Sequence, residues 1–396
     1  MLATGYILTI KKQPQKGDKN MPSVKIIHCA DLHIGATESF LSAKSQSRRQ
    51  ETLITFEKIM EAAVKSETDI VLIAGDLLDS NAIESGFFDR IIAAVKCAQN
   101  VKVVFAAGNH DPLCADSPFL SCDKPKNLFI LPTEYSYFEF PELKTRVYGK
   151  SFGSIYEKGV SVFPLDTDSE FINIMCLHGD LRSDLNSDYN SVTESFISNS
   201  GMDYIALGHI HKRSEIQKAG HTRYAYSGCA EGQGFDELGE KGVYIGEVSK
   251  ADIGLKFLPT SKRLHILQKT DVSGISNSQK ICDEIISTLY NLYGESATEN
   301  LYKIVLTGKI TDDVNISVAE IETLLNEKLY FAKVRNCTEP YIDYAELRKE
   351  KTLKGIFVNN MLNRIENADE GEKELLCKAL YLGINAFKSE VSFDEN

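Results

Sequence analysis

The chain of 396 residues is 43% hydrophobic and 25% charged, which is typical of folded globular protein with room for two or three domains. Its formal net charge of −12 excludes a surface that is basic overall, so nucleic-acid binding would need a local patch, a metal site or a partner. The nine scattered cysteines contain no CxxC pair, which predicts reduced thiols and a cytoplasmic protein. No apolar run reaches the ~18 residues of a membrane span, so we expect no membrane association.

The first 20 residues, "MLATGYILTIKKQPQKGDKN", place an apolar run before the positive charges. This order is opposite to that of a secretory signal. We therefore predict a loose N-terminal extension over 1–20. Met21 directly precedes the first expected strand, so a start at Met21 is an alternative.

The stretch 21–260 has the pattern of one α/β (α+β) domain. Strand and helix patterns alternate in its first half, and closely spaced strands with little helix follow, which suggests a second sheet packed on the first. The expected strands cover 23–30, 69–75, 101–108, 171–180, 202–211, 222–228 and 242–248, and the expected helices cover 45–66 and 84–98. The pattern predicts a two-sheet sandwich flanked by helices.

Two further regions follow a change of composition at "PTSKRLHILQKTD". Residues 261–337 have the order of a small βαβαβ domain. Its expected strands cover 263–273, 301–310 and 330–337, and its expected helices cover 276–292 and 317–328. The C-terminal region 338–396 is expected to be helical, because its apolar residues recur at three-and-four spacing.

Polar side chains follow the apolar runs of the first domain in the motifs DLH, GDLLD, GNHD, LHGD and GHIH. The residues concerned are Asp31, His33, Asp76, Asn109, His110, His178, His209 and His211. The carboxyl ends of such strands line one edge of a sheet, so we expect these groups to converge in one crevice. Gly75, Gly108 and Gly208 would allow the tight turns that this requires.

Each of these residues alone has an ordinary explanation as a turn former, a helix cap or a satisfied histidine. Their recurrence at several strand ends favours one shared site. His28 is expected to support the site from behind or to belong to the core, and His221 and His265 are expected to be structural or surface residues.

The predicted cluster combines hard oxygen donors with imidazole nitrogens and contains no thiolate. Such a set suits manganese, iron or zinc with five or six ligands. Two ions ~3.5 to 4 Å apart can activate a water and neutralise the attacking and leaving oxygens of an in-line displacement at phosphorus. The cluster therefore predicts phosphoester hydrolysis.

These ordered motifs resemble those of the calcineurin-like metallophosphoesterase superfamily, and more narrowly the SbcD-type DNA repair nucleases. The narrower likeness depends on "HCADLHIG", "GHIHKR", "YSGCAEGQGFDELGEKGVYI" and the small βαβαβ domain, which resembles that family's capping domain. The chain looks most similar to the bacterial YhaO-like branch, whose members are associated with SbcC-like ATPases. It departs from the pattern at Leu78, where an aromatic residue is common, and at "LHGD", which replaces a glutamine-containing turn.

The resemblance implies a role for each motif residue. Asp31, His33 and His211 would hold a first metal ion; Asn109, His178 and His209 would hold a second; and Asp76 would bridge them. His110 would stabilise the transition state or protonate the leaving oxygen, and Asp111 would orient the His110 ring by accepting a hydrogen bond. We expect two divalent ions, with Mn²⁺ preferred over Fe²⁺ or Zn²⁺.

Three functions follow as alternatives. The first is a nuclease, exonuclease or endonuclease, that processes DNA ends together with an SbcC-like (SMC-type) ATPase. The second is a phosphodiesterase of small nucleotides or a protein phosphatase, and the third is a non-catalytic scaffold for an ATPase. DNA and the ATPase are thus the expected partners, with a homodimer as a further expectation.

A basic pair could contact DNA, and two amphipathic segments could contact the ATPase. Lys212 and Arg213 follow the last histidine and could contact phosphates, although a basic pair beside a turn is more often solvated surface. The patterns "KTLKGIFVNNMLNRI" and "ELLCKALYLGINAF" predict amphipathic helices that dock the ATPase. Their apolar stripes would otherwise fold back on the chain's own core.

Overall fold

The computed structural model describes residues 22–311, 314 and 316–387, so the predicted extension 1–20 lies outside the described residues. The chain divides into two compact units. The first contains the described residues up to Leu267 together with Ser296–Lys303 and Leu329–Ala332, and the second contains Gln268–Glu295, the described part of Ile304–Lys328 and the described residues from Lys333 onward. The predicted boundaries near 260 and 337 stay predictions.

The first unit contains two six-stranded sheets. The first sheet has the order β14-β13-β1-β2-β3-β4. Its strands are β1 (Ser23–Cys29), β2 (Ile70–Ala74), β3 (Lys102–Ala106), β4 (Leu128–Ile130), β13 (Gly242–Ser249) and β14 (Ile253–Pro259). Strands β1 to β4 are parallel, and β13 and β14 extend the sheet in antiparallel pairs.

The second sheet has the order β11-β12-β10-β7-β6-β5. Its strands are β5 (Ser136–Phe140), β6 (Thr145–Lys150), β7 (Ile172–His178), β10 (Tyr204–Gly208), β11 (Gln217–Ala219) and β12 (Thr222–Tyr226). The four inner strands are parallel, and the two edge strands are antiparallel to their neighbours.

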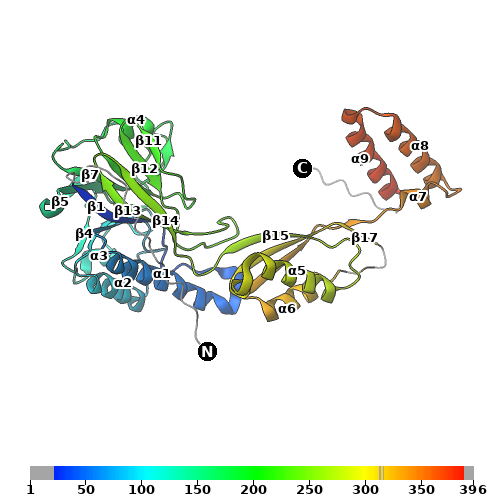
Figure 1. Cartoon of the computed structure of the whole chain (residues 1–396), viewed down its shortest axis with the longest axis horizontal. Helices are drawn as coiled ribbons and strands as arrows, with labels where there is room; N and C mark the ends of the chain where they lie inside the picture. The colour runs from blue at the N-terminus through cyan, green and yellow to red at the C-terminus, as the bar shows by residue number, and fades with distance from the viewer. Residues whose placement is uncertain (1–21, 312–313, 315, 388–396) are drawn as a thin grey trace. The chain divides into compact units, whose positions relative to one another are not determined.

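Alternate side chains of the first sheet enter two different cores, as the two-residue period of a strand requires. Ile27 and Val71 pack among residues of the helices α1 (Ser45–Lys65) and α2 (Ser85–Cys97), which lie together on one side of the sheet (Figure 1). Ile26 and Leu72 instead pack against side chains of the second sheet. The short helices α3 (Pro118–Ser121) and α4 (Glu194–Asn199) complete the layers, with α4 covering the outer face of the second sheet. The predicted α/β sandwich is confirmed.

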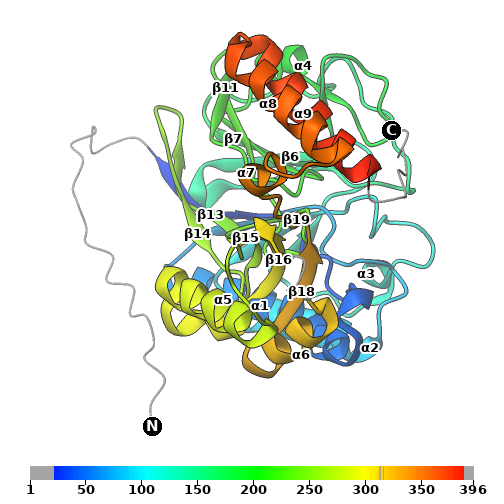
Figure 2. The same ribbon diagram turned by 90° about the vertical axis from the view of Figure 1, so that its right-hand side faces the viewer.

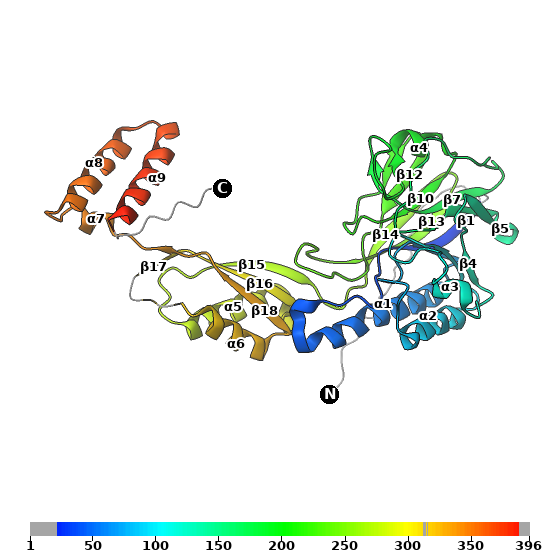
Figure 3. The same ribbon diagram turned by 180° about the vertical axis from the view of Figure 1, so that it is seen from behind.

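The C-terminal parts of three strands, in the order β15-β16-β18, form the sheet of the second unit, with α5 and α6 on one face (Figure 3). The strands are β15 (His265–Asp271), β16 (Leu301–Thr307) and β18 (Phe331–Asn336), and the helices are α5 (Ser278–Tyr293) and α6 (Val318–Lys328). Ile285 and Leu325 are among the helix residues buried on this face. The element order is the predicted βαβαβ.

The last helices are α7 (Tyr344–Leu347), α8 (Leu353–Asn367) and α9 (Glu370–Ala386). Helices α8 and α9 lie side by side (Figure 2). Thr352 and Asp369 cap their N-termini, accepting hydrogen bonds from the backbone of Gly355 and Glu372. The buried apolar side chains of this hairpin are Val358, Met361, Leu376, Leu380 and Ile384.

Short elements connect these parts. They are the strands β8 (Leu181–Arg182), β9 (Val192–Thr193), β17 (Lys309–Ile310) and β19 (Glu339–Pro340) and the 3₁₀ helices η1 (Ser39–Lys44), η2 (Pro141–Leu143) and η3 (Gly294–Glu299). Across the described residues, every helix is too short or too polar to cross a membrane.

Candidate metal centre

The carboxyl ends of five parallel strands, three from the first sheet and two from the second, carry the predicted site residues. Asp31 and His33 follow β1, Asp76 follows β2, Asn109 and His110 follow β3, His178 ends β7, and His209 and His211 follow β10. The turns after β1 and β2 are hydrogen bonded to each other, from Asp31 N to Gly75 O at 3.1 Å and from His33 N to Asp76 O at 3.0 Å. The fold thus brings distant parts of the chain to one place.

Asp31, His33 and His211 offer donor atoms that all lie within 4.8 Å of one another. The Nε2 atoms of His33 and His211 are 3.1 Å apart. Only one of two such nitrogens can donate to the other, whereas both can present a lone pair to a cation placed between them. This donor set fits a divalent ion.

A second group forms beside the first. His178 Nε2 lies 3.0 Å from Asn109 Oδ1, and the rings of His178 and His209 have centroids 5.1 Å apart. Asp31 connects the two groups, because its carboxylate accepts a hydrogen bond from the backbone of His209 at 2.9 Å. The structure therefore brings together the residues predicted to hold a second ion.

Asp76 lies between the two groups. Its Oδ2 atom is 3.3 Å from His178 Nε2 and 3.7 Å from His33 Nε2. Its Oδ1 atom accepts a hydrogen bond from the backbone N–H of His110 at 2.9 Å. One carboxylate oxygen is thus directed at both groups, as a bridging ligand requires.

The backbone at this site is strained. Asp31, His33, Asp76 and His209 have φ angles of 51°, 45°, 49° and 98°, a region that residues with a side chain seldom adopt. Gly75 also has a positive φ, 91°, and a Cβ atom placed on it would lie 2.1 Å from His178 Nδ1. The predicted need for glycine at this turn is confirmed.

Burial and neighbouring charges act in opposite directions on Asp76 and His178. Burial alone would raise the pKa of Asp76, but the adjacent His178 holds that pKa below its usual value. Burial would lower the pKa of His178, and the charge and hydrogen bond of Asp76 instead raise it to about 9. Among the protein groups alone, Asp76 is therefore ionised at neutral pH, the form that binds a cation.

The role predicted for Asp111 is wrong. Its buried carboxylate accepts hydrogen bonds from the backbone of Gly108 at 2.7 Å and of Leu78 at 3.0 Å, so it fixes two turns of the site. The His110 ring meets Asp79 instead, with Nδ1 3.0 Å from the Asp79 carbonyl oxygen. Because a carbonyl can only accept, Nδ1 of His110 carries a proton. Burial raises the pKa of Asp111 to about 7.

Sequence reasoning also missed side chains that surround the centre. The Asp79 carboxylate lies 3.4 Å from His33 Nδ1, Glu237 accepts a hydrogen bond from His211 Nδ1, and the Tyr189 ring lies against His209 with centroids 5.0 Å apart. Asp79 belongs to the GDLLD motif and Glu237 to "GFDELGE". The presence of an acidic residue in each motif was the only indication in the sequence that it could support the centre. The fold shows which histidine each acidic residue contacts.

The remaining histidines lie outside the centre. His28 is buried between the sheets and bonds to the Tyr204 hydroxyl at 2.9 Å and to Leu207 O at 3.1 Å, and burial lowers its pKa to about 3. His221 is exposed, as expected for a surface residue, and His265 is buried between Phe40 and Phe235.

The basic pair after the last histidine is exposed. The guanidinium of Arg213 stacks over the Phe257 ring, 4.2 Å from its centroid. Arg213 therefore already has a contact within the protein.

Comparison with known proteins agrees with this geometry. A family model described as Calcineurin-like phosphoesterase matches residues 24–213, the stretch that contains all eight residues of the centre. The matched stretch is a calcineurin-like metallophosphoesterase domain, a kind of hydrolase domain that uses divalent metal ions.

Individual relatives show which members of this family the chain is similar to. The chain is similar to the uncharacterized metallophosphoesterase YhaO of Bacillus subtilis, with 29% identity over 287 residues, 69% of each chain. It is also similar to two proteins named DNA double-strand break repair protein Mre11. The one from Saccharolobus solfataricus is 23% identical over 387 residues, 90% of this chain and 94% of the relative. The one from Aeropyrum pernix is 26% identical over 242 residues, 55% of this chain and 56% of the relative. The predicted resemblance, including that to the YhaO-like branch, is confirmed.

Proposed function

We propose that the protein is a two-metal phosphodiesterase that cleaves DNA ends, with Mn²⁺ as its preferred ion. The observation that carries the proposal is the position of Asp76 Oδ2, within 3.7 Å of an imidazole nitrogen of each group. A shared carboxylate oxygen is what two neighbouring cations need, and a single ion would not require it. Fe²⁺ and Zn²⁺ fit the same donors and are alternatives.

The residues divide the chemistry between them. Asp31, His33 and His211 would bind one cation, and Asn109, His178 and His209 the other. Two bound cations would supply Lewis acidity toward a phosphodiester and a water for in-line attack. The Nδ1 proton of His110 is held by Asp79 O, which leaves Nε2 to exchange a proton with the substrate. The exposed position of the His110 ring gives a substrate access to it.

An aromatic pair beside the centre supports a nucleic-acid substrate. Tyr189 contacts His209, and Tyr156 lies against Tyr189 with ring centroids 5.9 Å apart. Tyr156 is 63% exposed. Exposed aromatic rings next to a phosphate-binding centre can stack unpaired bases. The names of two relatives, DNA double-strand break repair protein Mre11, agree with DNA as the substrate.

The C-terminal helices are proposed to bind an SbcC-like ATPase. Part of each predicted apolar stripe is used inside the α8–α9 hairpin. Other apolar side chains stay exposed, including Ile356 at 57%, Leu375 at 67% and Leu382 at 54%. Exposed leucine and isoleucine on a helical hairpin suit a groove on a partner protein.

One assay separates the proposed nuclease from the alternatives. Purified protein with Mn²⁺ is offered linear duplex DNA, single-stranded DNA and a chromogenic phosphodiester, and the product ends are mapped. Cleavage of DNA at its ends supports the proposal. Cleavage of the chromogenic ester alone would favour a small-nucleotide phosphodiesterase or a phosphatase, and no cleavage of any substrate would favour a scaffold.

A further inference from the structure

Glu237 contacts the ring nitrogen of His211 that faces away from the centre. Its carboxylate accepts a hydrogen bond from His211 Nδ1, while Nε2 of the same ring lies 3.1 Å from His33 Nε2. A carboxylate can only accept, so the proton of the neutral ring is on Nδ1. The lone pair of Nε2 then faces the Asp31–His33–His211 group, as a metal ligand requires.

Both oxygens of the Glu237 carboxylate are held. Oε2 accepts a hydrogen bond from Gln233 N at 2.8 Å and lies 3.5 Å from the Cys229 thiol. The backbone N–H of Glu237 donates to Gly234 O at 3.1 Å, and the side chain is only 12% exposed. The carboxylate cannot turn without breaking these contacts, so it fixes the plane of the His211 ring.

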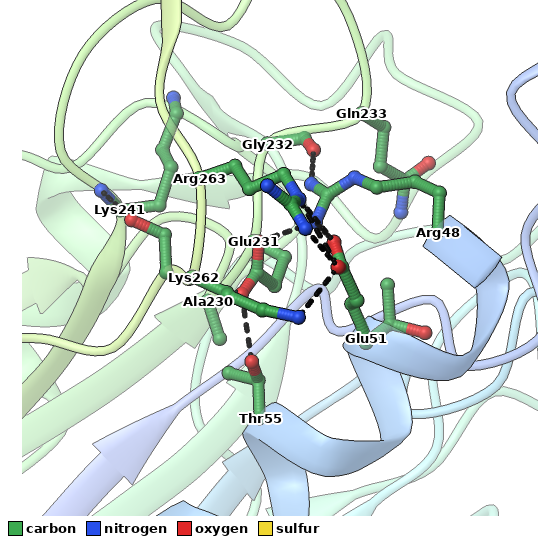
Figure 4. A network of polar contacts seen from close by, with 12 residues as sticks. Arg48, Glu51, Thr55, Ala230, Glu231, Gly232, Gln233, Lys241, Lys262 and Arg263 are labelled. Atoms are coloured by element: carbon green, nitrogen blue, oxygen red, sulfur yellow. Dashed lines mark hydrogen bonds and ion pairs between the residues drawn. The ribbon is translucent and has the colours of Figure 1, made fainter. Parts of the chain in front are cut away.

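The segment that carries Glu237 is anchored to α1. Arg48 contacts Glu231 Oε2 at 2.9 Å and donates to Gly232 O, and the other Glu231 oxygen accepts from Thr55 Oγ1 at 2.7 Å (Figure 4). Arg48 and Glu231 are each 1% exposed. A buried, charge-assisted network therefore fixes this segment a few residues before Glu237.

In the other metal group, the hydrogen-bond partner behind His178 is a neutral carbonyl, and the carboxylate oxygen Asp31 Oδ1 lies farther from the same Nδ1 atom, at 3.8 Å. His178 Nδ1 lies 3.0 Å from the backbone carbonyl oxygen of Ala74. A carboxylate makes an imidazole a more basic ligand than a neutral carbonyl does. His211 and His178 thus differ in the charge of the group that contacts Nδ1, although both direct Nε2 toward the centre.

We propose that Glu237 is a positioning residue that strengthens cation binding through His211, and therefore acts on the first metal site and leaves the second unchanged. The inference depends on the proposed two-metal function. Glu237 is outside the set of ligands, and its proposed effect is on the affinity for one of the two ions.

The test is a Mn²⁺ titration of the full chain, with free Mn²⁺ followed by electron paramagnetic resonance. Glu237→Ala should weaken one of the two sites by about 10- to 100-fold, the usual cost of losing such a partner. Glu237→Gln should lose less, because its amide oxygen still accepts from Nδ1. The matched control is Glu240→Gln, an exposed acid in the same segment, which should bind both ions like the unmodified protein.

A double variant distinguishes an effect through His211 from a general effect on the fold. His211→Ala already lacks the ring, so adding Glu237→Ala to it should cause no further loss of affinity. Full additivity of the two changes, unchanged affinity in Glu237→Ala, or equal weakening of both sites would each overturn the assignment. If the unmodified protein binds fewer than two Mn²⁺ ions, the proposed function itself fails.

Discussion

Asp76 and His178 form a buried contact between two sheets: Oδ2 of Asp76, after β2, lies 3.3 Å from Nε2 of His178, at the end of β7. The side chains are 3% and 0% exposed. Either group alone would be costly to bury, and each compensates the other. The site therefore depends on how the strand ends of the two sheets are aligned.

Replacing Asp76 tests whether its carboxylate serves both metal ions. Asp76→Ala should lower the Mn²⁺ content of the protein at both sites and abolish hydrolysis of a chromogenic phosphodiester, because one oxygen serves both ions. Elemental analysis and the ester assay measure the two effects, and Asp89→Ala, an exposed aspartate on α2, is the control. Wild-type activity in Asp76→Ala would exclude the two-metal site.

Replacing His110 separates chemistry from metal binding. His110→Ala should keep both ions, since His110 is outside the two donor groups, but turnover should fall by about 10²- to 10⁴-fold, the usual range for an acid–base group. Metal content and kcat are measured on the same preparation. Loss of one ion from this variant would reassign His110 as a ligand.

Gly75 provides a test of the strained turn. Gly75→Ala would place a methyl group 2.1 Å from His178 Nδ1 at a φ of 91°, so the free energy of unfolding should fall by at least ~1–3 kcal/mol. Gly86 in α2 has open space around its Cβ position, and Gly86→Ala should be neutral or stabilise by about 0.4–1 kcal/mol. Urea unfolding measures both. Equal stability of the two variants would contradict the close approach.

Arg48 provides a test of buried charge. Its guanidinium pairs with Glu38, Glu51 and Glu231 at 2.8, 3.0 and 2.9 Å. Arg48→Met should lower the free energy of unfolding by about 3–5 kcal/mol, because it leaves buried carboxylates with too few cations.

Arg90 is the surface comparison for Arg48. It pairs with Glu57 at 2.7 Å, and both side chains are solvent accessible. Arg90→Met should cost only about 0–1 kcal/mol. If urea unfolding gives the same loss for both arginines, then Lys262 and Arg263, which also contact Glu51, compensate for the missing charge.

Truncation tests the partner surface. A chain ending before Tyr341 retains every residue of the centre, so hydrolysis of the small ester should persist while co-purification with the SbcC-like ATPase should be lost. Leu375→Ser and Leu382→Ser in the full chain should weaken the complex without unfolding the protein, because both side chains are exposed. Retention of the ATPase by the truncated chain would refute the docking proposal, and so would its aggregation.

The elements nearest the centre were predictable from sequence because their strands are buried on both faces. Runs such as "IVLIA" in β2 are apolar throughout, and a polar residue after such a run is conspicuous. Strand β5, "SYFEF", has exposed positions between less exposed ones and was missed, as were β4, β6 and β14. The contacts of Asp79, Asp111 and Glu237 could not be predicted, because each joins residues from separate turns and spacing in the sequence does not determine such contacts.

The two-sheet origin of the centre has a thermodynamic consequence. Ions bound there would connect the ends of β1 to β3 with those of β7 and β10, and the unfolded chain would hold no such arrangement. The free energy of binding then adds to that of folding. A free ion concentration 100 times the dissociation constant stabilises the native state by about 2.7 kcal/mol. The melting temperature of this protein should therefore rise with the concentration of Mn²⁺. Removal of the metal should shorten the lifetime of the folded protein in addition to abolishing hydrolysis.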